Sequence, residues 1–315
     1  MNLRQIISLS ALMVILAVGN SCTRKNPKTE LSSPTSGEVL LYADESLSPV
    51  VIPLLQVFNG IYTYATVRCE YHPETDVLNA LLKSRTPMVF ATRPLKTEEK
   101  DYFISKKLLV REYLFALDAI TLIVNPSVTD SLISVGQIRD ILSGKTRTWT
   151  QLGFTATTDS IHVVFDNIGS GTVRFMLDTV CRGHQFGPGM NALKNNQEVI
   201  DYVSRNSGSM GIIGVSWISS SRDSASLNHL EKLKVLRISR TTPAVPENSF
   251  LPYQAFIKDL SYPLARRLYM INLEPRNGLA TGFASFVCSD RGQRIILKTG
   301  IMPLHEPIRN VKITD

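Results

Sequence analysis

Short apolar runs alternate with segments of helical spacing along most of the chain, and this alternation limits the class of fold that it can adopt. The strand-like runs are Glu38–Tyr42, Tyr64–Tyr71, Met88–Ala91, Leu114–Val124, Ser160–Phe165, Met210–Val215 and Lys234–Ile238. Helices are expected at Pro49–Phe58, Asp76–Lys83, Val135–Leu142, Val173–Val180 and Asn196–Ser204, with another soon after Pro94. Strands that alternate with helices predict an α/β fold with mixed, mostly parallel sheets.

Length and composition narrow the class further. The chain has 315 residues, more than the ~100–200 of a typical single domain, so the strands are expected to form two lobes. Its 43% hydrophobic and 19% charged residues are ordinary for a globular protein and exclude a disordered or fibrous chain. The formal net charge is +7, but the basic residues are scattered, so nucleic acid is not an expected partner.

Residues 1–21 have the pattern of a secretory signal peptide. Arg4 precedes the apolar run Ile6–Val18, which is shorter than the ~20 residues that span a bilayer. Cys22 after small residues predicts a lipid-anchored lipoprotein, although Asn20 departs from the strictest cleavage motif; the alternative is an uncleaved N-terminal anchor. Residues 22–37 are polar and predict a tether, which would hold the body at a membrane of the cell envelope, in the periplasm or at the cell surface.

The loop after Ser160–Phe165 carries the strongest ligand-binding pattern. It reads Asp-Asn-Ile-Gly-Ser-Gly-Thr over residues 166–172 and leads into a predicted helix. Its glycines allow a tight turn, and the backbone N–H groups and the hydroxyls of Ser170 and Thr172 at a helix N-terminus favour an anion. The alternative is a plain strand–helix turn in which a hydroxyl only caps the helix. The loop lacks the lysine of a Walker A motif and is not a G-x-S-x-G elbow.

Six blocks in a fixed order resemble the phosphate-binding periplasmic proteins that feed ABC transporters, within the type II solute-binding class. The blocks are Ala116–Pro126, Gly136–Trp149, Ile161–Thr172, Asn195–Gly214, Tyr262–Ile271 and Phe286–Leu304. The resemblance implies two lobes, joined by two crossing segments, that close over an oxyanion. Lobe 1 would be residues 38–116 plus 256–315, and lobe 2 residues 117–255. It also implies an ABC permease as partner, a small anionic solute such as phosphate, no cofactor and no catalysis.

Position by position, the resemblance assigns oxyanion contacts to loops on both lobes. The matching residues are Ser46 and Leu47 on the first lobe and Ser170, Gly171 and Thr172 on the second. For Leu47 the match concerns the backbone, because the family has a Thr-Phe pair there. A further family serine falls near Pro73 or Glu74, where this chain has no obvious equivalent.

Two departures from the family pattern change the charge of the expected site. The family's Asp, which accepts the proton of hydrogen phosphate, falls on Thr92, and the family's Arg, which pairs with the oxyanion, falls on Asp166. A charge-assisted hydrogen bond is worth roughly 1.5–3 kcal/mol, and a carboxylate in place of the guanidinium also repels an anion. Arg93 is the expected substitute; alternatively it is a solvated surface residue.

These departures leave two hypotheses. The first is an oxyanion-capturing protein of an ABC importer. The second is a cell-surface sensing or interaction lipoprotein that kept the fold and lost phosphate selectivity. A hydrolase with Ser170 as nucleophile is a poor third, because no His or Asp stands at recognisable spacing.

The remaining candidate residues are weaker. The five histidines are widely separated, so no metal site is expected. In the pair Arg266-Arg267, one guanidinium is expected in solvent and the other near the hinge. Packing in the core is expected for Trp149 and Trp217. At most one disulfide, or more simply small buried thiols, is expected from Cys69, Cys181 and Cys288.

Overall fold

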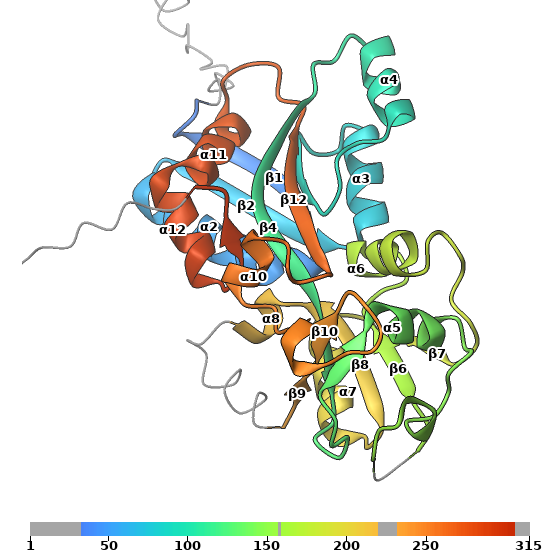
Figure 1. Cartoon of the computed structure of the whole chain (residues 1–315). Helices are drawn as coiled ribbons and strands as arrows, with labels where there is room; N and C mark the ends of the chain where they lie inside the picture. The colour runs from blue at the N-terminus through green and yellow to red at the C-terminus, as the bar shows by residue number, and fades with distance from the viewer. Residues whose placement is uncertain (1–32, 157–158, 220–231, 306–315) are drawn as a thin grey trace, which may run out of the picture. The chain divides into compact units, whose positions relative to one another are not determined.

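Figure 1 shows the computed structural model, which describes residues 33–156, 159–219 and 232–305. All of these belong to the unit Ser32–Asp315, the larger of two units into which the chain divides. The predicted signal peptide 1–21, its Cys22 and the predicted tether up to residue 32 lie outside the described residues and stay predictions. Within the described ranges, no helix is long and apolar enough to cross a membrane.

A ten-stranded sheet forms the framework of this unit, accompanied by a three-stranded one. The order along the large sheet is β2 (Ala65–His72), β1 (Gly37–Asp44), β3 (Met88–Ala91), β12 (Ala265–Asn272), β4 (Arg111–Val124), β8 (Ser209–Gly214), β6 (His162–Phe165) and β7 (Met190–Ala192). Off this path, β13 (Met302–Pro303) and β9 (Lys234–Val235) pair with β4. The small sheet has the order β11 (Ser249–Phe250), β10 (Arg237–Ser239), β5 (Leu132–Ser134).

In the large sheet the outer strands pair in parallel, whereas the central strands pair antiparallel. β1 is parallel to β2 and β3, and β6 is parallel to β7 and β8. β4 and β12 are antiparallel to each other, and also to β8 and β3 respectively. The predicted mixed α/β fold is therefore confirmed, but parallel pairing prevails only in the outer strands. The cause is β4, which pairs with β12 along Arg111–Ala119 and with β8 along Ile120–Val124 and so runs through both halves of the sheet (Figure 1).

The helices follow the strands in the predicted alternation. They are α2 (Ser48–Ile61), α3 (Glu74–Leu82), α4 (Thr97–Ser105), α5 (Val135–Leu142), α6 (Gly171–Phe175), α7 (Asn196–Arg205), α8 (Ser216–Ser219), α10 (Gln254–Lys258), α11 (Leu279–Cys288) and α12 (Asp290–Lys298). Short 3-10 turns occur at η1 (Glu45–Leu47), η2 (Thr150–Leu152) and η4 (Pro246–Asn248). The helix expected at 173–180 is in fact α6 followed by a π-helical turn, η3 (Met176–Val180).

Alternating side chains of the strands pack against different helices. In β3, Met88 and Phe90 belong to the main core with α2, α11 and α12, whereas Val89 and Ala91 belong to a second cluster with α3 and with Phe103 of α4. Successive residues of a strand point to opposite faces, so this short apolar run is buried on both sides. Burial on both faces holds β1 and β3 in place, and with them the loops that follow these strands.

Three expectations need correction or refinement. The run expected as one strand at Lys234–Ile238 forms β9 and β10, which pair in different sheets on either side of buried Leu236. All three described cysteines are free, but only Cys181 is buried; Cys69 is half-buried and Cys288 exposed. Trp149 is confirmed as a core residue, and its indole N–H donates to the Gly208 carbonyl at 3.0 Å.

Candidate ligand-binding site

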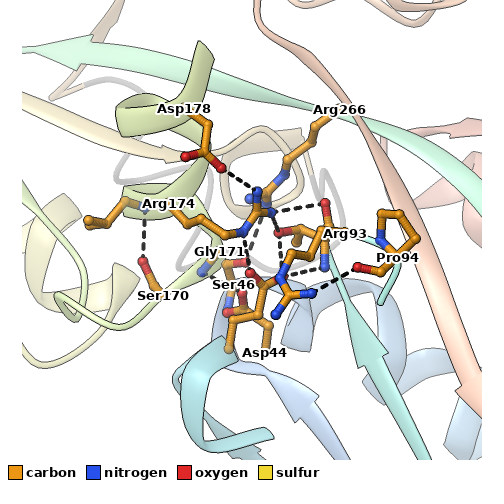
Figure 2. A network of polar contacts seen from close by, with 12 residues as sticks. Asp44, Ser46, Arg93, Pro94, Ser170, Gly171, Arg174, Asp178 and Arg266 are labelled. Carbon is orange, nitrogen blue, oxygen red and sulfur yellow. Dashed lines mark hydrogen bonds and ion pairs between the residues drawn. The ribbon is translucent and has the colours of Figure 1, made fainter. Parts of the chain in front are cut away.

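Loops that follow three strands of the large sheet meet in one polar network, part of which is drawn in Figure 2. β1 ends at Asp44, just before η1; β3 ends just before Thr92; and β6 ends just before Asp166. The backbone N–H of Gly171 donates to the Asp44 carboxylate at 2.7 Å and ties the loop after β6 to the loop after β1. In open α/β sheets, ligands bind at such an edge, because strand ends and helix N-termini meet there.

The Ser-Gly-Thr turn begins α6, but most of its donors are used inside the protein. Ser170 Oγ accepts a hydrogen bond from the Val173 N–H at 3.1 Å, so the helix-capping alternative is confirmed for this hydroxyl. The same hydroxyl donates to the Asp166 carboxyl at 2.5 Å. Thr172 Oγ1 is fully buried and has no hydrogen-bond partner among the described residues. Of the expected side-chain donors of this turn, only the Thr172 hydroxyl is left unused.

Gly171 lies where only a residue without a side chain fits. A Cβ at this position would overlap the Thr92 hydroxyl and the Asp44 carboxylate. The protein's own carboxylate therefore lies against the turn at the point where the family resemblance implies the oxyanion.

The charged residue next to Thr92 is Glu74, the first residue of α3. Its Oε1 accepts hydrogen bonds from the Thr92 N–H at 2.6 Å and the Thr92 hydroxyl at 2.7 Å. Its Oε2 accepts from Arg174 Nε at 2.5 Å, and Arg174 also donates to Thr92 Oγ1 at 2.8 Å. Burial alone would raise the pKa of Glu74, but the Arg174 guanidinium and these hydrogen bonds lower it overall. Glu74 is thus ionised and already paired.

Two other carboxyls of the network hold their protons more tightly than usual. Burial and the negative charge of Glu74 raise the pKa of Asp44 to about 6, against the opposing effect of Arg266. Burial and the charge of Asp44 raise the pKa of Asp166 to about 8. At neutral pH, Asp166 therefore carries its proton. An acid at the position of the family's Arg thus costs less repulsion toward an anion than its formal charge suggests.

Asn196 and Glu45 complete the side of the network nearest α7. The Asn196 amide donates to Glu45 at 2.7 Å and to Asp166 at 3.1 Å, and Asn196 Oδ1 is without a partner within the described part of the chain. Burial raises the pKa of Glu45, and the hydrogen bonds from Asn196 partly oppose this. This side of the network therefore has more hydrogen-bond acceptors than donors.

Arg266 enters the network from β12. Its Nε and Nη2 bind Oδ2 of buried Asp118 at 2.9 and 2.8 Å, and Nη2 also donates to Ser46 Oγ at 3.3 Å. Arg266 is 4% exposed, whereas Arg267 is exposed, so the predicted division of this pair is confirmed. Figure 2 shows the Arg266 side chain reaching toward the loop that carries Ser46 and Asp44.

Arg93 lies on the rim of the network, next to an open cavity of about 330 Å³ lined also by Lys96 and Arg174. Both of its terminal nitrogens bind the Glu99 carboxylate at 2.7 Å, and Nη1 also donates to the Pro94 carbonyl at 2.9 Å. Its charge is therefore neutralised by a bidentate partner. That Arg93 replaces the family's guanidinium stays a prediction.

The structure brings most of the sequence-predicted residues together. Those in the network are Ser46, Thr92, Asp166, Ser170, Gly171 and Thr172. Leu47 is fully buried in the main core, where its side chain packs among apolar residues. The residues that sequence reasoning missed are Asp44, Glu45, Glu74, Asp118, Arg174 and Asn196. Asp44 had a signal, because it ends an apolar strand, whereas Asn196 and Arg174 look like ordinary helix residues.

Among the described residues, no group of three or more His, Cys, Asp or Glu side chains has the arrangement of a metal site. The acidic groups of the network are instead held by N–H and O–H donors of the protein.

The fold and the meeting of these loops are those of the periplasmic-binding class. The family model described as "PBP superfamily domain" matches residues 28–291, and the chain belongs to this superfamily. The fold is the two-lobed type II architecture of its structural neighbours, and β4 is the strand that runs through both halves of the large sheet.

Two curated relatives of the chain share the description of a phosphate-binding protein. It is 28% identical over 208 residues to the phosphate-binding protein PstS of Staphylococcus epidermidis RP62A, and equally to that of Staphylococcus aureus USA300. These matches cover 64% of this chain and 59% of each relative. An ABC-type phosphate transport receptor from Vibrio cholerae superposes with a TM-score of 0.64 at 17% identity, over 85% of this chain and 100% of the other. A phosphate-binding protein from Stenotrophomonas maltophilia superposes with a TM-score of 0.62 at 14% identity, over 86% of this chain and 92% of the other.

Proposed function

We propose that this chain is an extracytoplasmic solute-binding protein that captures an oxyanion of the phosphate class and presents it to an ABC importer. One observation carries the proposal: within a type II fold, the Ser-Gly-Thr turn at the start of α6 faces the loops after β1 and β3. The lobes would be residues 38–116 plus 256–315 and residues 117–255, with the solute between them.

Binding would involve the exchange of a hydrogen-bond partner and the closure of the two lobes, without a chemical reaction. The Gly171 N–H now donates to Asp44, so an incoming oxyanion must take over this donor as the Asp44 carboxyl withdraws or is protonated. Acceptors such as Asp44 and the unpartnered Asn196 Oδ1 favour a solute that carries its own O–H groups, as hydrogen phosphates do. Ser170 is engaged both as a cap and as a donor to Asp166, which argues against a role as nucleophile.

The cellular context follows from the N-terminus. We infer that Cys22 carries the lipid that anchors the protein to a membrane, and that the closed form is recognised by an ABC permease. A Cys22→Ser variant should leave the membrane fraction. Retention in the membrane after this change would support the uncleaved-anchor alternative.

A second candidate is favoured by one specific observation. The face of the turn expected to bind the solute is covered by Asp44, while Thr92 and Asp166 stand where the family has charged ligands. A lipoprotein that uses the fold for sensing, or for contact with another envelope protein, would not need an open oxyanion site with charged ligands. Exclusive co-purification with a regulator or receptor supports it, and exclusive capture of a permease contradicts it.

The deciding experiment is titration calorimetry of the purified full chain in mild detergent with phosphate, sulfate and molybdate. A thermal-shift series provides the independent check, since a ligand at a hundredfold excess over Kd stabilises the native state by ~2.7 kcal/mol. Phosphate binding supports the proposal. If none of the three oxyanions binds at concentrations up to millimolar, the proposal is refuted and the sensing function becomes the better candidate.

A further inference from the structure

We propose that Arg266 of β12 holds the charge of the bound oxyanion, together with the hydroxyls of Ser46 and Thr172. It would replace the guanidinium that the family carries at the position of Asp166. This inference rests on the proposed function and names the residues that carry out its binding step.

The Arg266 guanidinium is held in place by protein contacts but not fully used. A guanidinium has five N–H groups. Those of Nε and Nη2 are directed to Asp118 and to Ser46, which fixes the plane of the group. Nη1, with two N–H groups, has no partner in the described part of the chain, although the side chain is only 1% exposed. A buried donor of this kind is costly unless something accepts from it.

Two hydroxyls can act with this guanidinium: Ser46 Oγ contacts it, and Thr172 Oγ1 belongs to the loop that the Gly171 N–H ties to Asp44. Ser46 Oγ accepts from Arg266, so its own proton is free to be donated. Thr172 Oγ1 is fully buried and unpartnered. The Asp44–Gly171 hydrogen bond joins the two loops that carry these hydroxyls. The donors therefore come from the start of β12 and from the two loops that the Asp44–Gly171 hydrogen bond joins.

Electrostatics supports the same location. The charge of Arg266 opposes the rise in pKa at both Asp44 and Asp166, so its field acts on both carboxyls. Gly214 of β8 provides the room, because a Cβ there would lie 3.2 Å from Arg266 Nη2. An oxyanion held here would lie between Arg266 and the Ser-Gly-Thr turn.

The two competing guanidinium groups are already neutralised. Arg93 gives both terminal nitrogens to Glu99. Arg174 gives Nε to Glu74, Nη2 to Thr92 and Nη1 to Asp178. Arg266 is also paired, with Asp118, but it differs from both because its buried Nη1 has no hydrogen-bond partner among the described residues.

The test measures inorganic phosphate binding by calorimetry on the full chain and on three variants. Arg266→Lys keeps a positive charge beside Asp118 but lacks the second terminal nitrogen. Thr172→Val removes a hydroxyl that has no partner in the described structure, so the melting temperature without phosphate should stay equal or rise. Arg93→Gln is the control for the competing guanidinium.

We expect Arg266→Lys and Thr172→Val each to weaken phosphate binding on the order of 10- to 100-fold, and Arg93→Gln to change it less than about threefold. If the wild type binds phosphate and both Arg266→Lys and Thr172→Val bind it with a near-wild-type Kd, this inference is wrong and the proposed function stands. A wild type that binds no oxyanion overturns the proposed function, and this inference with it. Melting curves of each variant separate a lost contact from a lost fold.

Discussion

The proton on Asp166 gives the sharpest test of the buried network. We predict that Asp166→Asn removes a pH dependence of stability that the wild type shows. The Asp166 carboxyl is 1% exposed, and its pKa rises from 3.8 to about 8 because of burial and of the neighbouring Asp44 charge. Asn has the same shape, keeps an acceptor oxygen and never ionises, so the pair isolates the charge.

The magnitude follows from the interval between the two pKa values. Between pH 4 and 8, folded Asp166 holds a proton that the unfolded chain has released, so the free energy of unfolding falls as the pH rises. The stabilisation is fully present below about pH 4 and is lost by about pH 8. An interval of about 4 pH units at ~1.4 kcal/mol each gives a loss on the order of 5 kcal/mol. Asp166→Asn should not show this loss.

The assay is urea unfolding of both proteins at several pH values from 4 to 9, without phosphate. The difference between wild type and variant cancels the titration of all other groups that the substitution leaves undisturbed. Asp101→Asn, at an exposed position of α4, is the control and should run parallel to the wild type. If the wild-type and Asp166→Asn curves also run parallel, the assignment of the proton to Asp166 is wrong.

Three further outcomes are expected. Gly171→Ala should abolish phosphate binding and lower the melting temperature, because the new Cβ would overlap Asp44 and Thr92. Gly60→Ala in α2 is the control: its Cβ would meet nothing within 4 Å, so the change should be neutral or stabilising. Glu74→Gln should cost about 2–4 kcal/mol in urea unfolding, because part-buried Arg174 loses its buried charge partner and keeps only the exposed Asp178. Asp178→Asn, whose side chain is 62% exposed, should cost less than about 0.5 kcal/mol. Phosphate titrations from pH 8 to 5 should show wild-type affinity rising relative to Asp44→Asn as Asp44, with a pKa of about 6, gains its proton and releases the Gly171 N–H.

The strand and helix pattern of the sequence predicted the framework well. Met88–Ala91 and Val135–Leu142 coincide with β3 and α5, because apolar runs and apolar periodicity report burial directly. The pattern failed at Lys234–Ile238, where a continuous apolar alternation is divided between two sheets. Periodicity says which face of a segment is buried, but it does not say against which neighbour.

The candidate site was predictable only where neighbours in sequence act together. The Ser-Gly-Thr turn is contiguous and was found, whereas Glu74, Thr92 and Arg174 meet from three separate elements. Nothing local distinguishes Arg174 from a solvated helix residue. The apolar run around the Arg266-Arg267 pair predicted that the two side chains would have different surroundings, but not which one is buried. The Asp118 partner of Arg266 on β4 is 148 residues away.

The substitutions at Thr92 and Asp166 are best understood as one rearrangement of charge. With Asp166 in place of the Arg that the resemblance implies, and with acids also at positions 44 and 74, the site would be strongly negative if every carboxyl ionised. The structure limits this by pairing Glu74 with Arg174, by protonating Asp166 and by setting Arg266 beside Ser46. Because Asp44 can occupy the Gly171 donor by itself, the contact between the two loops does not need a solute. The Asp44 carboxylate and the oxyanion would then compete for the same donor, so any solute that this protein captures must bind it more tightly than the protein's own carboxylate does.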